Sequence, residues 1–426
     1  MSPIWDGYLE LGGNEVVNSL RAQAYAANAG VNLACEDCPD LPESVGDEPY
    51  FTLDADPAPW YDPKAPETWG FYGVLGLGVT GFAGAPIARE ATDLIGDGAY
   101  YSPPRLGARE IAYTVALVAR DECSLAFGLQ YLSWVLNGSS SCQGCAGDQM
   151  CLFSCCPGMA PSAYDPGDAE IRHLYDVTLI EAPTIAPDAI QEFGGLLIAT
   201  TTFTLAAQKP HIYTDPLASL GDWTLITSGQ RLNGYDPDEV IKECRQPPNC
   251  LDDEQCPPPA DPPRPPQIVD PCYPTGPDNW WRTRIHLSPL DQPQYMEAVP
   301  VVEIDTGAEE LRRVVVRFWL NPQDLPCDQV NDPCQACLDI TVPFLPAKSR
   351  LTVDGRTQRA QVECPDITTG RASYATPQLY TQLGGPFVWP VFECPTGFCI
   401  EVLAPRATVA DDARIRVQLV PRSQVG

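Results

Sequence analysis

The chain has 426 residues and a formal net charge of −30, from 56 acidic and 26 basic side chains. This excess of carboxylates disfavours a surface that follows nucleic-acid phosphates or anionic lipids, because such surfaces need clustered lysine and arginine. No run of about 18 apolar residues occurs, so the sequence predicts no membrane insertion.

Composition and length predict a mainly β protein with more than one domain. The 46 prolines and 33 glycines favour many turns and short strands over long helices. From changes in composition along the chain, we predict a β-sandwich or split-barrel domain with one packed helix over residues 1–215. A proline- and cysteine-rich linker over 216–277 and an antiparallel β-sandwich over 278–426 then follow.

Residues 69–84 contain a formal GxGxxG pattern at Gly76, Gly78 and Gly81. Dinucleotide folds use such glycines before a helix, but no amphipathic helix opens here and Pro86 follows closely. A glycine-bearing strand is therefore favoured, and no cofactor is predicted. Two elements are expected before this stretch, namely a short helix over 15–28 and an ordered loop over 35–66.

The segment 105–138 has the clearest local pattern, a strand followed by a helix. Residues alternate between two apolar faces, which indicates a strand covered on both sides. The faces consist of Ile111, Tyr113, Val115 and Leu117 on one side and of Ala112, Thr114, Ala116 and Val118 on the other.

The helix after that strand is predicted to be capped by Ser124 and to end at Asn137-Gly138. Its apolar residues form two stripes, which is more than one buried face requires. We predict either a central core helix or a helix whose second stripe meets another subunit. The stripes are Leu125, Leu129, Leu132 and Leu136, and Phe127, Tyr131 and Trp134.

Eighteen cysteines occur in local clusters, which is unusual for a protein of the reducing cytosol. The N-terminus lacks the basic and apolar regions of a signal peptide, so Sec export is not predicted. Two explanations fit: the thiols hold zinc, or the protein forms disulfides after release by another route, such as lysis by a virus.

Disulfides are favoured over zinc, although the pairing is open. The zinc alternative would use Cys142, Cys145, Cys151 and Cys155, of which only the first pair has suitable spacing. Cys123 is a candidate partner for this cluster. The full set of disulfide candidates is Cys35, Cys38, Cys123, Cys142, Cys145, Cys151, Cys155, Cys156, Cys244, Cys250, Cys256, Cys272, Cys327, Cys334, Cys337, Cys364, Cys394 and Cys399.

No catalytic residue is predicted. The three histidines, His173, His211 and His286, are widely separated and form no HExxH or HxH pattern. Neither a GxSxG elbow nor a GxxxxGK[ST] loop occurs. Clustered cysteines are typical of structural crosslinks rather than of a nucleophile.

The second half predicts an antiparallel β-sandwich of the jelly-roll or galectin-like kind. Asp354-Gly355 marks a hairpin turn. The predicted strands lie at 280–288, 298–305, 312–322, 338–346, 349–355, 359–364, 387–394, 398–405 and 413–421.

Five aromatic residues of this half could stack on sugars or lie in the core, and burial is the more common fate of Trp and Tyr in sandwiches. They are Trp280, Trp281, Tyr374, Tyr380 and Trp389.

Several stretches together resemble siphophage distal tail proteins, in particular the minor tail proteins of actinobacterial, mycobacteriophage-like phages. The N-terminal stretches are similar to the ring domain of that family, and the last two to its C-terminal sandwich. The stretches are 105–119, 125–138, 151–158, 172–185, 201–213, 345–365 and 384–402.

This resemblance implies a structural virion protein without enzymatic activity. Such a protein forms a homo-oligomeric ring, usually a hexamer, between the tail tube and the tail tip or baseplate. The implied partners are the chain itself, the tail-tube protein, proteins associated with the tail tip or tape measure, and receptor-binding proteins, with no sequence-specific binding of nucleic acid. The C-terminal domains would support receptor-binding proteins or contact the host surface.

Two alternatives remain open from the residues alone. The chain could be a carbohydrate-binding module for cell-wall adhesion, or a cell-wall hydrolase that uses two of its many carboxylates.

Overall fold

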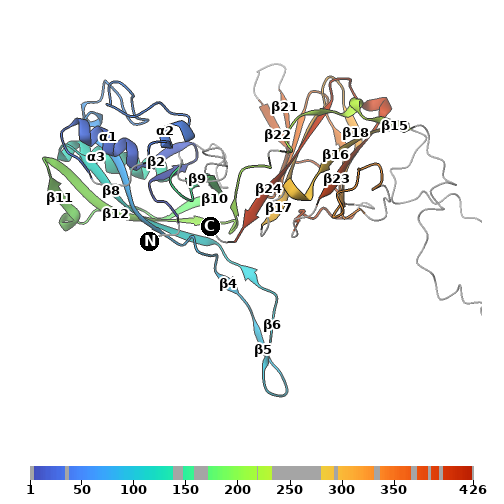
Figure 1. Cartoon of the computed structure of the whole chain (residues 1–426), viewed down its shortest axis with the longest axis horizontal. Coiled ribbons are helices and arrows are strands. Elements are labelled where there is room, and N and C mark those ends of the chain that lie inside the picture. Colours follow the sequence, from blue (N-terminus) through green and yellow to red (C-terminus); the bar gives the residue numbers. More distant parts are fainter. Residues whose placement is uncertain are drawn as a thin grey trace, which may run out of the picture. The chain divides into compact units, whose positions relative to one another are not determined.

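The computed structural model describes residues 4–33, 38–137, 147–157, 171–217, 219–232, 280–291, 296–330, 336–365, 372–381, 385–392 and 397–424 (Figure 1). The chain divides into two compact units, which are Met1–Asp215 with Arg422–Gly426, and Pro216–Pro421. The sequence-based division differs from this one in two places. Residues 216–232, assigned to the linker, belong to the second unit, and the last five residues return to the first.

Both units are mainly β and their paired strands are antiparallel, as the sequence predicted. None of the helices in the described ranges is long and apolar enough to cross a membrane.

The first unit contains one strongly curved sheet, with the strand order β2-β1-β9-β10-β12-β8-β3. β11 and β10 both pair with the same edge of β12, and β13 pairs with β10. The strands are β1 (Tyr8–Leu11), β2 (Asn14–Asn18), β3 (Phe71–Thr80), β8 (Arg109–Ala119), β9 (Asp148–Phe153), β10 (Ile171–Glu181), β11 (Ile190–Phe193), β12 (Leu196–Ala207) and β13 (Ile212–Tyr213).

One hydrophobic core joins the two ends of this sheet. Leu9 and Val17 come from β1 and β2, and Tyr113 and Phe203 come from β8 and β12, yet all four are buried in the same cluster. The sheet therefore curls around its core, with helix α3 (Glu122–Leu136) packed inside.

Strand β8 is buried on one face throughout, but on the other face only near its end. Ala116 and Val118 are covered by residues of α1 (Ser19–Asn28), whereas Ala112 and Thr114 are only half-buried. The prediction of a strand covered on both sides is therefore wrong for the first half of β8.

Helix α3 begins two residues before the predicted cap. Asp121 has extended backbone and its carboxylate accepts the Ser124 N–H at 2.9 Å, so Asp121 is the N-cap and Ser124 lies inside the first turn. Asn137 is the C-cap, as predicted.

The predicted helix over 15–28 is shorter than expected. Residues 14–18 form β2, and α1 begins only after Asn18, whose side chain caps Arg21 N–H at 3.0 Å. A buried ion pair between Glu15 and Arg21, with 3.1 Å from Oε1 to Nε, joins the strand to the helix. The loop that follows includes the short helix α2 (Leu41–Ser44) and the 3-10 turn η1 (Pro66–Thr68).

The second unit is a sandwich of two antiparallel sheets around one core. One sheet has the order β15 (Gln230–Leu232), β16 (Trp280–Leu287), β23 (Phe398–Pro405), β18 (Leu311–Leu320) and β19 (Leu338–Leu345). The other has the order β14 (Thr224–Leu225), β24 (Arg414–Ser423), β17 (Glu297–Asp305), β20 (Arg350–Asp354), β21 (Arg359–Pro365) and β22 (Ala372–Ala375).

All but one of the strands predicted for this half are present. Residues 387–392, the described part of the predicted strand 387–394, form no strand, because only Phe392 makes an isolated bridge, to Ala298. The stretch contains Pro390, which has no amide N–H to donate to a ladder. The predicted hairpin is formed by β20 and β21, with a turn over residues 355–358.

Candidate functional site

The most distinctive surface of the first unit is a two-stranded arm between β3 and β8, formed by residues 81–108. Its short strands pair as β4 (Ile87–Ala88) with β7 (Arg105–Leu106) and β5 (Ala91–Asp93) with β6 (Ala99–Tyr101). Figure 1 shows the arm extending away from the body of its unit.

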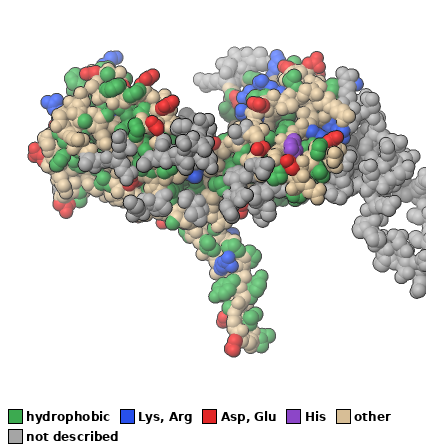
Figure 2. Space-filling view, viewed as in Figure 1, with side chains coloured by type: hydrophobic (Ala, Val, Ile, Leu, Met, Phe, Trp, Pro, Cys, Tyr) green, Lys and Arg blue, Asp and Glu red, His purple; other side chains and the backbone are tan. Residues whose placement is uncertain are grey.

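Apolar side chains of the arm are open to solvent. Ile87 is 60% exposed, Leu94 is 54% exposed and Ile95 is fully exposed, and Tyr100 and Tyr101 are also more than half exposed. Figure 2 shows hydrophobic side chains along much of the arm. Exposed apolar side chains gathered in one place are typical of interaction sites.

Arg109 holds the base of the arm. Its guanidinium is buried and donates to four backbone carbonyl oxygens. Two belong to adjacent residues at the start of the arm, one to the segment before β13 and one to the last described residue of the chain. The acceptors are Gly81 at 3.3 Å, Phe82 at 2.8 Å, Pro210 at 2.9 and 3.0 Å, and Gln424 at 2.6 Å. Burial lowers the pKa of Arg109.

Helix α3 presents the second candidate surface. The two predicted stripes do not separate into a buried and a free face, because Tyr131 is buried and donates to the Glu15 carbonyl at 2.8 Å. Phe127 and Leu129 are half-buried against the core, and Trp134 is 52% exposed. Leu125, Leu132 and Leu136 are buried. The outward part of the helix is therefore centred on Trp134 alone.

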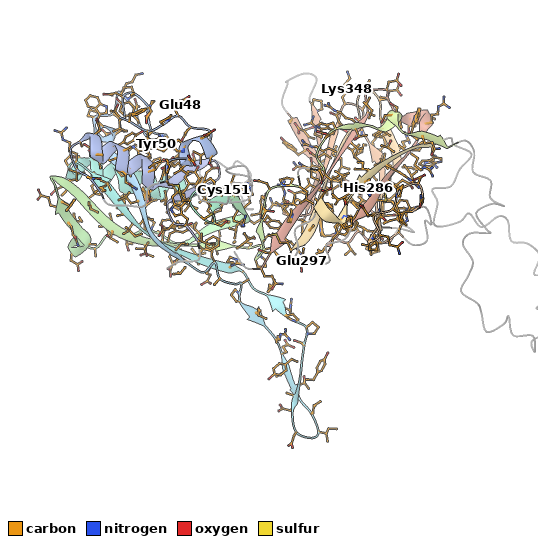
Figure 3. All side chains as sticks on the ribbon, in the orientation of Figure 1. Glu48, Tyr50, Cys151, His286, Glu297 and Lys348 are labelled. Carbon is orange, nitrogen blue, oxygen red and sulfur yellow. A yellow bond between two sulfur atoms is a disulfide. The ribbon has the colours of Figure 1, made fainter. Side chains whose placement is uncertain are left out.

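A cluster of polar side chains lies on the first sheet, around Cys151 of β9, which Figure 3 labels. Cys151 is paired in register with His173 of β10. The Cys151 Sγ lies 3.2 Å from His173 Nδ1, and His173 Nε2 lies 2.9 Å from an oxygen of Asp215. The Gln149 amide nitrogen is 3.1 Å from the same Nδ1. These distances match those of a catalytic arrangement in which a base contacts a thiol and a carboxylate orients the base.

The thiol in this cluster is nevertheless not activated. Burial, followed by the charge of Glu10, raises the pKa of Cys151 to about 12. A nucleophilic cysteine needs a lowered pKa, because the thiolate is the reactive form. The geometry therefore describes a hydrogen-bonded cross-strand pair. Local sequence patterns do not reveal this pair, because His173 and Asp215 are 22 and 64 residues from Cys151 and strand register brings Cys151 beside His173.

The structure joins Cys38 to Cys156 in the first unit and Cys327 to Cys399 in the second. Cys123, Cys151, Cys337 and Cys364 are thiols, so the structure does not place these four candidates in disulfides. Cys155 is exposed at the surface of the first unit. The candidates that lie outside the described residues are Cys35, Cys142, Cys145, Cys244, Cys250, Cys256, Cys272, Cys334 and Cys394.

Cys142 and Cys145 of the zinc alternative lie outside the described residues. Within the described ranges, no group of three or more His, Cys, Asp and Glu side chains could hold a metal ion.

The predicted aromatic residues of the second half do not form one surface. Trp280 is buried against Val315 and Leu403, and Trp281 and Trp389 pack partly against the sandwich core. Tyr374 is 63% exposed on β22. Tyr380 makes an isolated bridge to Thr341.

The GxGxxG glycines belong to a strand and its end. Gly76 and Gly78 lie within β3, which pairs with β8, and Gly81 follows it with a positive φ of 94°. A Cβ at Gly81 would lie 2.0 Å from the Glu110 carbonyl oxygen, so glycine is required where the arm departs from the sheet.

No family model matches the sequence, and no curated protein matches it. Among solved structures, the chain is similar to the SPP1 Dit (gp 19.1) protein, described as a hub adsorption apparatus of phages infecting Gram-positive hosts. That match has a TM-score of 0.35 and 12% identity and covers 84% of this chain and 94% of the other. A chain of the phage p2 baseplate in its activated conformation with Sr matches with a TM-score of 0.36 and 9% identity. That match covers 83% of this chain and 91% of the other. A chain of the baseplate with Ca matches with a TM-score of 0.34 and 10% identity, and covers 78% of this chain and 90% of the other.

Proposed function

We propose that this chain is a non-enzymatic structural protein of a long-tailed phage. Copies of it form a ring at the distal end of the tail. The resemblance of the sequence to siphophage distal tail proteins implies that the ring is a hexamer. The ring lies between the tail tube and the tail tip or baseplate, and the second unit supports receptor-binding proteins or meets the host surface. The exposed apolar arm over residues 81–108 is the observation that carries the proposal.

The arm fits a head-to-tail contact between copies. The arm of one copy would bind a different surface on the next copy. Each copy therefore uses two separate surfaces and can bind one neighbour on each side. Such heterologous contacts close into a ring when the rotation between copies allows it. Burying Ile87, Leu94 and Ile95 on a neighbour would contribute several kcal/mol, at about 25 cal/mol per Å² of apolar surface.

Helix α3 supports the same assembly. The exposed Trp134 ring gives the first unit a second apolar contact point, and Trp residues are enriched at the centres of protein interfaces. We therefore assign the outward part of α3 to the subunit interface. The raised pKa of Cys151 argues against this thiol as a nucleophile.

The test is the mass of the purified particle, by light scattering and negative-stain imaging, before and after shortening the arm. Residues 87–106 would be replaced by a two-residue turn between Pro86 and Gly107, whose backbone groups already hydrogen-bond at 2.8 Å. The full chain should form closed rings, alone or on addition of the tail-tube protein. The shortened chain should remain a folded monomer.

A point variant refines this test. Ile95→Asp should weaken assembly, because it introduces a charge into the buried contact without touching the fold. Val388→Asp, at an aliphatic position of the second unit that is 64% exposed, is the control and should assemble normally. Rings that form equally well without the arm would refute its role, and a chain that remains monomeric even with tail-tube protein would refute the ring.

A further inference from the structure

The outer part of the arm, formed by β5 and β6, carries exposed side chains on both of its faces. Strand register assigns them, because residues opposite each other in an antiparallel pair share a face and neighbours along a strand alternate. Tyr101 lies opposite Ala91, and Tyr100 lies opposite Thr92. The two tyrosines are adjacent in β6, so their rings lie on opposite faces. Tyr100 is 64% exposed and Tyr101 is 58% exposed.

We call these surfaces the Tyr101 face and the Tyr100 face. Leu94 belongs to the Tyr100 face, because its N–H donates to the Gly98 carbonyl at 3.0 Å and so continues the ladder by one residue. Figure 3 shows side chains projecting from both sides of the arm. The other members are Ala91, Asp93 and Ala99 on the Tyr101 face and Thr92 on the Tyr100 face.

A two-stranded ribbon has no interior of its own. One sheet layer buries an apolar face only by packing against another layer. If the arm lay on the body of a neighbouring copy, one face would be covered and the tyrosine of the other face would remain in water. Covering both faces therefore takes a partner on each side of the arm.

The two faces differ in charge. The Tyr101 face holds Asp93, which is the only acidic residue of β5 and β6. Two Tyr101 faces packed together would bring two of these carboxylates into one contact, which is unfavourable because like charges repel and each loses water. On the Tyr100 face, the hydroxyls of Thr92 and Tyr100 can donate to a carboxylate. Contact between unlike faces is therefore favoured over contact between two Tyr101 faces.

The sizes of the side chains are also complementary. On the Tyr101 face, the tyrosine has Ala91 opposite it and Ala99 two positions before it on the same strand, so space is left around the ring. On the Tyr100 face, Leu94 and Tyr100 both project. Facing layers pack well when large side chains of one lie over small side chains of the other.

We propose that the arms of successive copies stack on one another, with the Tyr101 face of one arm on the Tyr100 face of the next. The partner of the arm is then the arm of a second copy, and each arm is covered on both sides. This inference rests on the ring proposed above and names the surface that receives the arm. A contact between two different faces repeats from copy to copy around a ring, whereas a contact between identical faces ends at a dimer.

The experiment uses two variants of the full chain, each with one face altered. Tyr100→Asp and Tyr101→Asp place a charge on opposite faces, at positions that are exposed in the single chain. Light scattering and sedimentation measure the mass of each variant over a range of protein concentrations, and each should remain a monomer. Tyr374→Asp is the matched control, because Tyr374 is a strand tyrosine of the second unit that is 63% exposed. It should assemble like the unaltered chain.

Mixing the two variants tests the stacking directly. The Tyr101 face of the Tyr100→Asp chain and the Tyr100 face of the Tyr101→Asp chain are both unaltered, so one contact can form. The mixture should contain particles of twice the monomer mass and none larger, because the two outer faces of such a pair are altered. The mixture also controls for the fold of the arm, since an arm that had lost its structure could not supply its unaltered face.

Three results would overturn the inference. One variant assembles like the unaltered chain, which would show that the arm uses only one face. One variant forms dimers by itself, which would show that identical faces meet. The mixture contains no particle heavier than the monomer. If the unaltered chain forms rings, these results refute the stacking and leave the ring in place, whereas an unaltered chain that stays monomeric even with tail-tube protein refutes both.

Discussion

The guanidinium of Arg109 donates to the Gln424 carbonyl over 2.6 Å, which ties the base of the arm to the end of the described chain. Arg109→Met removes the donors to Phe82, Pro210 and Gln424 together and leaves their carbonyl oxygens without this partner. We expect the first unit to lose about 3 kcal/mol of unfolding free energy.

Denaturant unfolding of the first unit measures this effect. Arg105→Met, an exposed position on the arm, is the control and should change the unfolding free energy by less than about 0.5 kcal/mol. Equal stability of the two variants would show that the hydrogen bonds of Arg109 do not stabilise the first unit.

Gly128 of α3 lies against the ring of Phe71 on β3. A Cβ at this position would come within 2.3 Å of a ring carbon, so alanine requires the ring or the helix to move. Although alanine favours a helix over glycine by about 1 kcal/mol, we expect Gly128→Ala to destabilise the first unit by about 1–3 kcal/mol. The double variant Gly128→Ala with Phe71→Leu should recover part of that loss, and additive effects in this cycle would contradict the contact.

Local patterns predicted the elements well, because alternation and helical spacing are read within one segment. Helix α3 and the strands of the sandwich follow from such patterns. The errors are local as well. Ser124 has the side chain of a cap, but Asp121 comes first and takes that role. Residues 387–392 have strand composition but lack a continuous partner.

The candidate surfaces were harder to predict, because they depend on register or on exposure. Nothing in the sequence places Cys151 beside His173 until the strands are paired. The arm escaped prediction for a different reason. Its strands are only two or three residues long and both faces are open, so no burial pattern marks them.

The Cys151 thiol should react slowly. With a pKa of about 12, only about one part in ten thousand is thiolate at pH 8. Iodoacetamide should therefore label the exposed Cys123 in the native protein well before Cys151, as read by peptide mass spectrometry. His173→Ala should leave the labelling rate of Cys151 unchanged. Rapid labelling of Cys151 that disappears in His173→Ala would instead indicate an activated nucleophile.

Asp305 should make the second unit sensitive to acid. Burial alone would raise the pKa of this carboxyl, but the Gly307 N–H and the guanidiniums of Arg414 and Arg350 together lower it. The stabilisation is therefore fully present above the unfolded pKa of about 3.9 and is lost as the pH falls through the lower folded value. Hydrogen exchange of residues 301–305 should increase over that window. Asp305→Asn should exchange faster at neutral pH and change less on acidification.

The buried pair of Arg317 and Asp339 should show the largest effect of any single substitution in the second unit. The two side chains lie opposite each other on β18 and β19, are both almost fully buried, and form two parallel hydrogen bonds of 2.8 Å. Asp339→Leu leaves a guanidinium buried without its carboxylate, so we expect a loss of about 3–5 kcal/mol. Arg317→Met should destabilise by a similar amount. The double variant should be much less destabilised than the sum, because it removes both charges. Denaturant unfolding of the four proteins measures the coupling, and additive losses would show that the pair does not act as a unit.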